Sequence, residues 1–338
     1  MSVRVGINGF GRIGRNFLRA ALASGADVEV VGVNDLTSPE TLAHLLRYDS
    51  TQGRMPVRVD VEGSDLLVGE HHIRVMAERE PEQLPWGALG VDVVIESTGR
   101  FTSRADAAGH LHGTVKRVII SAPSSDADHT FVIGVNDDEY DPEKHIVVSN
   151  ASCTTNCFVP MVKVIDDNFK IVSGLMTTVH AYTNDQNLLD LTHTDLRRAR
   201  AGAVNIVPSS TGAARATSLV LESMKGRLDG MSLRVPLPVG SITDFTAVVN
   251  GNPSVAEVNA AFAEAAAKPP LDHVLDYTED LLVSSDIVGS PASCTFDAGL
   301  TMVQTINDDM SLVKTEGWYD NEWGYSNRLV DLTVLVGE

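Results

Sequence analysis

Short apolar runs that end at turn residues recur along the chain as far as Asn150. Runs of this length, bounded by turns, are typical of buried strands in a parallel sheet. The expected strands are Val3–Ile7, Val28–Val33, Val91–Ser97, Val115–Ser121 and His145–Ser149. Apolar residues at helical spacing predict a helix at Arg15–Leu22, and Thr102 or Ser103 can cap another that continues to about His112. This alternation predicts a doubly wound (Rossmann) α/β domain.

The pattern loosens between Thr41 and Trp86. Short strands such as Val57–Val61 and Ile73–Met76 are separated there by turn residues. We interpret this stretch as an insertion at the edge of the sheet.

Longer strands without regular crossover helices follow Asn168. They are expected at Phe169–Val179, Ser232–Pro238 and Ile242–Val249. A capping box of Ser254 and Glu257 opens the helix predicted for Ser254–Ala267. The pattern predicts a second, α+β domain with a mixed or antiparallel sheet, over residues 152–321.

The last segment predicts one more helix. Tyr325, Leu329, Leu332 and Val336 would share one face of it. Such a face must be buried, and we expect it to pack on the first domain. That domain is therefore expected to comprise residues 1–151 completed by 322–338.

Composition narrows the class of protein. A chain of 338 residues suits about two domains. The 26 basic and 45 acidic residues give a formal charge of −19, which argues against binding nucleic acid or an anionic membrane. No apolar run approaches the ~18 residues of a membrane span. Three cysteines and no leader-like opening segment favour a reducing, cytoplasmic compartment.

A glycine triplet follows the first predicted strand. Gly9, Gly11 and Gly14 form G-x-G-x-x-G between a strand and a helix, where they allow a tight turn, a close approach to a pyrophosphate and close helix packing. Asp35 ends the second strand about 20 residues later, where an acid binds the ribose hydroxyls of a dinucleotide. Because its carboxylate would repel a 2′-phosphate, the cofactor is expected to be NAD.

Cys153 lies at a second strand-to-helix turn. A thiol that faces the start of a helix has a stabilised thiolate, so we expect a lowered pKa and a nucleophile here. Cys157 would share its helical face, but two thiols without further clustered ligands do not make a zinc site, and no metal is predicted. A structural role is favoured for Cys157.

Several motifs, taken together, resemble phosphorylating glyceraldehyde-3-phosphate dehydrogenases over nearly the whole chain. They are Ala151–Cys157, Thr177–Gln186, Asp195–Arg200, Ser210–Ala214, Arg234–Pro236 and Trp318–Gly324. The resemblance implies that Cys153 is the nucleophile, that His180 is its acid/base partner, and that the chain forms a homotetramer. It also implies a glycolytic or gluconeogenic reaction in which glyceraldehyde 3-phosphate, inorganic phosphate and NAD give 1,3-bisphosphoglycerate.

The resemblance also assigns binding residues. The pyrophosphate would meet Arg12 and Ile13, the nicotinamide carboxamide would be held by Asn321, and Ser121 and Arg79 would line the cofactor site. Two anion sites would be formed by Thr183, Arg198 and Arg234 with Ser152, Thr154, Thr211 and Gly212. Arginine forks and hydroxyl groups suit phosphate oxygens.

The residues support the same chemistry on physical grounds. A thiolate that adds to an aldehyde gives a hemithioacetal, which can expel hydride onto a nicotinamide and leave a thioester that phosphate displaces. His180, at the end of a strand, is suited to take the hydroxyl proton.

Two alternative functions and one departure from the family's sequence pattern remain open. Erythrose-4-phosphate dehydrogenase uses the same cysteine and histidine, and a catalytically idle dinucleotide-binding scaffold would keep only the fold. Thr192 stands where the family usually has proline, and its hydroxyl could favour a 2′-phosphate. The charge of Asp35 should outweigh one added hydrogen bond of roughly 1 kcal/mol, so NAD is retained as the expected cofactor.

Overall fold

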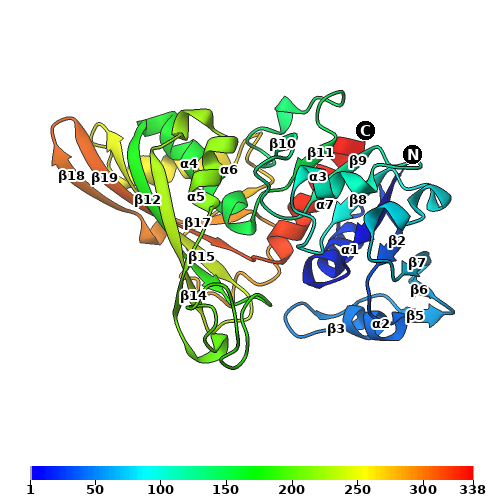
Figure 1. Cartoon of the computed structure of the whole chain (residues 1–338). Helices are drawn as coiled ribbons and strands as arrows, with labels where there is room; N and C mark the ends of the chain where they lie inside the picture. Colours follow the sequence, from blue (N-terminus) through cyan, green and yellow to red (C-terminus); the bar gives the residue numbers. More distant parts are fainter. Residues whose placement is uncertain (1, 338) are drawn as a thin grey trace. The chain divides into compact units, whose positions relative to one another are not determined.

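One parallel sheet organises the first of two structural units. The computed structural model describes residues 2–337, which divide into Met1–Ala151 with Ser326–Glu338 and, separately, Ser152–Tyr325. Within that range the main sheet of the first unit has nine strands, in the order β10-β11-β9-β8-β1-β2-β7-β6-β5 (Figure 1). They are β1 (Val3–Asn8), β2 (Val28–Asn34), β5 (Val59–Glu62), β6 (Asp65–Val68), β7 (His71–Met76), β8 (Val93–Glu96), β9 (Arg117–Ile120), β10 (His129–Thr130) and β11 (Val147–Ser149).

The strand pairing confirms the parallel sheet and the edge insertion that were expected for this unit. Every pair from β10 to β7 is parallel, whereas β5 and β6 pair antiparallel at one edge. The loosely patterned stretch is therefore an edge insertion. Strand β1 lies between β2 and β8, and the chain runs from β1 to β2 through α1 (Arg12–Ser24). This reversal of strand order leaves a crevice at the carboxyl end of β1.

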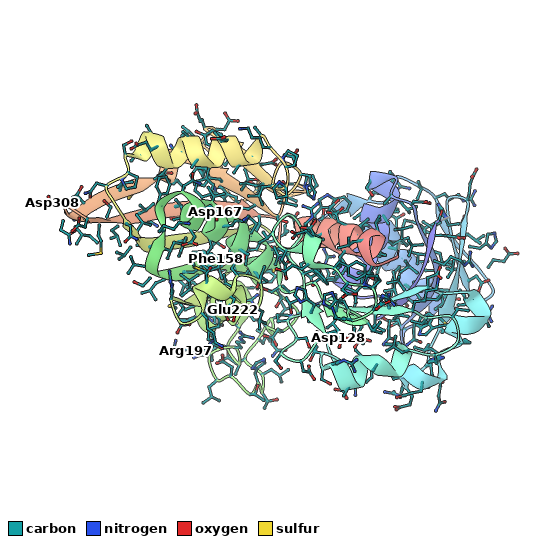
Figure 2. The ribbon with its side chains drawn as sticks, turned by 90° about the horizontal axis from the view of Figure 1, so that it is seen from above. Asp128, Phe158, Asp167, Arg197, Glu222 and Asp308 are labelled. Carbon is teal, nitrogen blue, oxygen red and sulfur yellow. The ribbon has the colours of Figure 1, made fainter. Side chains whose placement is uncertain are left out.

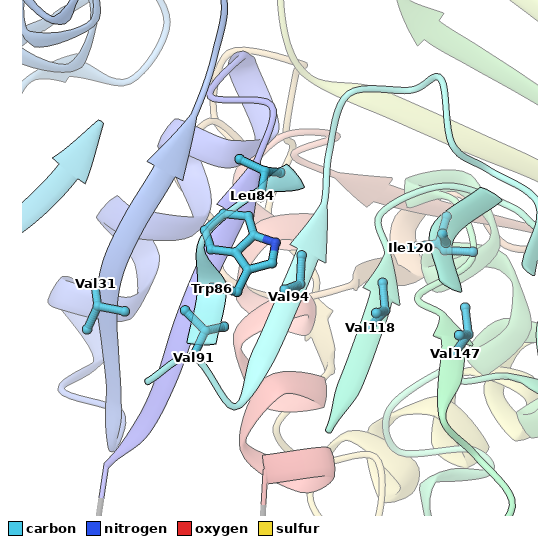
Figure 3. Close-up of a cluster of buried hydrophobic side chains, with 9 residues drawn as sticks. Val31, Leu84, Trp86, Val91, Val94, Val118, Ile120 and Val147 are labelled. Atoms are coloured by element: carbon cyan, nitrogen blue, oxygen red, sulfur yellow. The ribbon is translucent and has the colours of Figure 1, made fainter. Parts of the chain in front are cut away.

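Trp86 fills the centre of the apolar core beside this sheet. Figure 3 shows its indole among Val31, Val91 and Val94. The strand beneath carries Gly6, where a Cβ would lie 2.7 Å from the indole Cζ3. The glycine thus makes room for the largest side chain of the cluster.

The helices of this unit depart in part from expectation. Helix α2 (Pro39–Arg47) is absent from the expected elements, although Ser38 caps it and Pro39 occupies its first position. Helix α3 (Arg104–Ala107) is shorter than expected and continues only as a 3-10 turn, Ala108–His110. A short hairpin, β3 (Tyr48–Asp49) with β4 (Gly53–Arg54), follows α2.

The second unit is built on a mixed sheet, as expected. Its order among the described residues is β13-β14-β12-β15-β19-β17-β16, with β18 paired to β19. The strands are β12 (Ile171–Ala181), β13 (Val207–Ser210), β14 (Leu228–Val235), β15 (Ser241–Asn250), β16 (Leu275–Thr278), β17 (Cys294–Asp297), β18 (Met302–Asn307) and β19 (Met310–Tyr319). Only β12 with β14 and β16 with β17 pair parallel.

Helix α4 (Cys153–Phe169) packs on this sheet. Phe158, labelled in Figure 2, meets Phe245 of β15 edge-on, with ring centroids 4.8 Å apart. The helix includes Phe169, which was expected to begin the next strand, so that strand begins at Ile171. Helix α5 (Ala213–Ala216) is a single turn, and α6 (Val255–Ala266) has the expected capping box at Ser254 and Glu257.

The last helix, α7 (Trp323–Gly337), buries the four apolar residues predicted for one face, Tyr325, Leu329, Leu332 and Val336. From Ser326 onward it belongs to the first unit. No helix in the described range is both long and apolar enough to cross a membrane.

Candidate active site and cofactor pocket

Cys153 is the first residue of helix α4. Ser152 caps the helix in an extended conformation, and its Oγ accepts a hydrogen bond from Thr155 N at 3.0 Å. Ala151, just before it, has a left-handed φ of 54°, which an alanine rarely adopts. The backbone at the start of the helix is therefore tightly constrained, and Cys153 cannot shift without disturbing the cap.

Cys153 faces His180, as expected from the sequence. The Sγ atom lies 3.4 Å from His180 Nε2. His180 Nδ1 is 2.7 Å from the carbonyl oxygen of Ala181, and because a carbonyl can only accept, Nδ1 must carry the proton. The lone pair of the neutral imidazole is therefore on Nε2, directed at the thiol. This is the tautomer that a general base needs.

Arg234 adds a positive charge beside this pair. It lies opposite His180 in the parallel register of β12 and β14. Its Nη1 donates to the Ala181 carbonyl at 3.2 Å and lies 3.1 Å from His180 Nδ1. Burial, together with the Arg234 charge, lowers the pKa of His180 to about 3. The imidazole is thus neutral at physiological pH.

The expectation of a lowered thiol pKa is wrong for this structure. Burial raises the pKa of Cys153, and Arg234 and the hydrogen bonds from Thr154 counter that effect only in part. The start of the helix favours the thiolate, but desolvation of the buried sulfur has the larger effect on the pKa. The resting pair is a thiol hydrogen-bonded to a neutral imidazole.

Tyr319 contacts residues beside both Cys153 and His180. Its hydroxyl lies 2.9 Å from Thr154 Oγ1 and 2.7 Å from Thr178 Oγ1. The ring meets the His180 imidazole edge-on, with centroids 5.9 Å apart. Burial raises the pKa of Tyr319, so the hydroxyl stays protonated. The side chain of Thr154, a candidate phosphate ligand, is engaged in this contact.

The candidate anion residues form two groups. Arg234 adjoins His180, and the charge of Arg198 also acts on the pKa of His180. Arg198 Nη2 donates to Ser210 O at 3.1 Å, which places Arg198 beside the loop of Thr211 and Gly212. The second group, Ser152 and Thr154, lies at the start of α4.

Some of these groups already have protein partners. Arg198 Nη1 donates to Asp185 Oδ2 at 2.6 Å, and Thr211 Oγ1 accepts from Ala213 N at 3.2 Å. Thr183 lies two residues beyond the end of β12, where its carbonyl accepts from Gln186 N at 2.9 Å. An incoming phosphate would compete with the Asp185 carboxylate for Arg198.

Asn321 lies in the same unit as the thiol and imidazole. Its Oδ1 accepts from Gly240 N at 3.1 Å and from Ser241 Oγ at 3.2 Å. Within residues 2–337 its Nδ2 has no hydrogen-bond acceptor. This arrangement leaves an amide donor for a ligand, as the nicotinamide assignment requires.

The first unit holds the predicted dinucleotide motif in a cavity of about 430 Å³. The cavity lies at the ends of β1, β2 and β8, and Gly9, Gly11, Asp35 and Arg79 are among its lining residues. Gly9 has φ +91°, and a Cβ there would lie 2.6 Å from Thr98 N. A Cβ at Gly11 would meet nothing within 4 Å, which leaves open space at the start of α1. These residues fit the pyrophosphate of a dinucleotide.

Asp35 links the second strand to the glycine turn. Its Oδ2 accepts from Phe10 N at 3.1 Å, and its Oδ1 accepts from Thr37 N at 3.0 Å. At Gly14 a Cβ would lie 2.3 Å from Gly9 O, so helix and turn pack closely there. The carboxylate is thus held at the rim of the cavity.

The other predicted cofactor residues lie in different surroundings. Arg12 donates to Asp49 Oδ2 at 2.5 Å and to Thr51 Oγ1. Although burial opposes it, hydrogen bonds from the Gln52 backbone and the Arg12 side chain lower the pKa of Asp49. Arg12 therefore has a carboxylate partner. Ile13 lies in the first turn of α1, and Ser121 Oγ donates to Ser97 Oγ at 3.0 Å.

Several residues of these sites escaped sequence reasoning. Glu78, Glu80, Arg100 and Phe101 line the cavity but lie outside the glycine motif. Tyr319 is in a recognised motif, but nothing in its spacing reveals contacts with Thr154 and Thr178. The strand register and the packing of α4 on the sheet bring these groups together.

Comparison with known proteins identifies the family. The model "Glyceraldehyde 3-phosphate dehydrogenase, NAD binding domain" matches residues 3–104, and the "C-terminal domain" model of the same family matches residues 152–321. A glyceraldehyde-3-phosphate dehydrogenase of Streptomyces coelicolor is 60% identical over 337 residues, covering 100% of this chain and 99% of the relative. One of Mycobacterium tuberculosis is 60% identical over 344 residues with the same coverage. The chain belongs to the glyceraldehyde-3-phosphate dehydrogenase family.

Proposed function

We propose that Cys153 and His180 carry out the NAD-dependent oxidation and phosphorylation of glyceraldehyde 3-phosphate. The chain is an NAD-dependent oxidoreductase of the glycolytic glyceraldehyde-3-phosphate dehydrogenase class. The observation that carries the residue assignment is the 3.4 Å contact between a thiol and the unprotonated nitrogen of a buried imidazole.

The first step forms a carbon–sulfur bond. Because the resting pair is neutral, the Cys153 proton moves to His180 Nε2 as the sulfur adds to the aldehyde carbon. The imidazolium then returns this proton to the new alkoxide, which gives a hemithioacetal and a neutral His180. Proton transfer is thus coupled to bond formation.

Oxidation follows on the sulfur-bound substrate. His180 Nε2 takes the hydroxyl proton of the hemithioacetal, the carbonyl reforms, and the carbon loses its hydrogen with both electrons. NAD, when bound, accepts that hydride. Inorganic phosphate then attacks the thioester carbon, the C–S bond breaks, and the leaving thiolate of Cys153 regains a proton from His180, while the proton of the attacking hydrogen phosphate is released to solvent. The product is 1,3-bisphosphoglycerate.

The two anion sites are proposed to bind the substrate phosphate and the attacking phosphate. Arg198, Arg234 and Thr183 form one site with Thr211 and Gly212, and Ser152 and Thr154 contribute at the start of α4. Guanidinium groups supply the local positive charge that a chain of net charge −19 needs for two phosphates.

NAD binding is assigned to the glycine motif and its neighbours. The proposed ligands are Gly9, Gly11, Arg12, Ile13, Gly14, Asp35, Arg79, Ser121 and Asn321. The carboxylate of Asp35 disfavours a 2′-phosphate, although Thr192 could allow residual use of NADP. Residues 1–151 with 322–338 are proposed to form the cofactor domain, and residues 152–321 the catalytic domain.

Exposed apolar residues support the proposed homotetramer. The loop after β12, in which Figure 2 labels Arg197, exposes Leu188, Leu189, Leu191, Leu196, Val204 and Ile206. A separate groove on the sheet, about 680 Å³ in volume, is lined by Leu175, Leu228, Val248 and Leu312. Apolar surface of this extent is typical of subunit contacts. A cytoplasmic location is proposed with it, since the three cysteines are free thiols. Light scattering of the purified chain would measure the mass of the assembly.

Initial rates test the proposed reaction. Reduction of NAD with glyceraldehyde 3-phosphate should require inorganic phosphate, and NADP should react more slowly. Rapid oxidation of erythrose 4-phosphate that is indifferent to phosphate would favour the alternative, erythrose-4-phosphate dehydrogenase, in which water releases the product. Unchanged activity in Cys153→Ala would remove the thiol from the mechanism and revive the scaffold hypothesis.

A further inference from the structure

Ser241 lies between Ala181, which follows His180 in β12, and Asn321. It is the first residue of β15 and is only 1% exposed. Its Oγ accepts a hydrogen bond from Ala181 N at 3.1 Å and lies 3.2 Å from Asn321 Oδ1, to which it donates. The single hydroxyl proton is therefore committed to Asn321.

The Asn321 amide is oriented by two donors. Gly240 N donates to the same Oδ1 at 3.1 Å, so a flipped amide would place NH₂ against both an N–H and an O–H. Gly240 has φ +88°, and a Cβ there would lie 2.4 Å from Ser284 O. The glycine keeps this backbone donor in place, and the hydroxyl of Ser241 is the second, independent constraint.

The other end of the connection reaches the imidazole. Ala181 donates its backbone N–H to Ser241, and its carbonyl oxygen, in the next peptide group of the chain, accepts from His180 Nδ1 and Arg234 Nη1. One hydroxyl thus contacts the residue whose carbonyl sets the His180 tautomer and the amide proposed to hold the nicotinamide. Each of these hydrogen bonds joins a different pair of groups.

We propose that Ser241 is a positioning residue for hydride transfer. It fixes the amide of Asn321 so that Nδ2 is presented to the nicotinamide carboxamide, and it holds the backbone N–H of Ala181, the residue whose carbonyl orients His180. The inference rests on the proposed function only for the identity of the ligand that Asn321 holds. Burial alone does not explain the arrangement, because buried Ser232 on β14, which lies on the other side of β12 in the same sheet, has no hydrogen-bond partner for its Oγ within the described range.

Two ligands separate positioning from general stability. NAD carries the nicotinamide that Asn321 is proposed to hold, whereas ADP-ribose lacks it. In Ser241→Ala the Kd for NAD should rise about five- to tenfold, the loss expected for one neutral hydrogen bond, while the Kd for ADP-ribose stays unchanged. Ser241→Thr, which keeps the hydroxyl, should restore the ratio of the two constants. Ser232→Ala is the matched control and should change neither constant.

A double-mutant cycle locates the effect. If Ser241 acts through Asn321, adding Ser241→Ala to Asn321→Ala should weaken NAD binding no further. In the single variant, a deuterium isotope effect with aldehyde-deuterated substrate should increase, because hydride transfer becomes slower relative to the other steps. If Ser241→Ala does not fold, Ser241→Cys fills the same space with a weak donor and carries the same prediction.

The outcomes are distinct. Equal weakening of NAD and ADP-ribose binding, or no weakening of either, overturns the proposal. Additive losses in the double variant also overturn it. A wild-type chain that binds NAD but does not oxidise glyceraldehyde 3-phosphate would refute the proposed function and leave the binding test of Ser241 intact.

Discussion

Removing one oxygen from Tyr319 should destabilise the catalytic unit by about 2 kcal/mol. In Tyr319→Phe the ring stays, so its contact with His180 is kept and no large cavity forms. Two hydrogen bonds are lost, one to Thr154 Oγ1 at 2.9 Å and one to Thr178 Oγ1 at 2.7 Å. Each buried neutral hydrogen bond contributes about 1 kcal/mol to stability. The hydroxyls of Thr154 and Thr178 would stay buried after losing this partner.

The free energy of unfolding in urea is the direct assay. Tyr277→Phe is the matched control, since it removes a tyrosine hydroxyl whose bond to Glu279 is exposed, and it should change stability by less than about 0.5 kcal/mol. A cycle of Tyr319→Phe with Thr178→Val should give a coupling of about 1 kcal/mol. If Tyr319→Phe is no less stable than Tyr277→Phe, the hydroxyl does not brace the site as the distances indicate.

Three further predictions concern the charges and the backbone of the sites. Because the folded-state pKa of His180 is about 3, below the ordinary 6.5, the unfolded state binds its proton more readily. Stability present above pH 6.5 should fall by about 5 kcal/mol towards pH 3, and His180→Asn should remove this part of acid unfolding. Arg234→Ala should raise the pKa of the Cys153 thiol, so the pH profile of alkylation should move upward, and an unmoved profile contradicts the assignment. Gly9→Ala should abolish NAD binding, measured by titration, because of its φ of +91° and the approach of Thr98 N; normal affinity would count against the close turn.

Local patterns in the sequence were sufficient for the elements that carry the site. The glycine triplet, Asp35 and Cys153 each sit at the end of a strand, so the parallel sheet alone predicts where they lie. The pairing of Cys153 with His180 came from the resemblance to a family, and the structure brings the two side chains together. Helix α2 was missed because the apolar pattern loosens just where Ser38 and Pro39 signal its start.

Contacts between strands could not be predicted in this way. Ser241 meets Ala181 and Asn321 because β15 begins at the level where β12 and β19 end, a matter of register. The prediction of a lowered pKa for the Cys153 thiol is wrong for a related reason. The start of a helix is visible in the sequence, whereas the depth at which the sulfur is buried depends on the packing of the whole unit.

Arg234 has opposite effects on the two partners of the catalytic pair. Its charge favours the Cys153 thiolate, and it also disfavours protonation of His180, which weakens the base that must accept the proton. A phosphate bound to the proposed anion site would partly neutralise that charge. The pKa of His180 should then rise, so its basicity would be greatest when a phosphorylated substrate is in place. An aldehyde without a phosphate leaves the Arg234 charge uncompensated and the imidazole a weak base. In the proposed function, the arrangement therefore links recognition of the substrate phosphate to proton transfer.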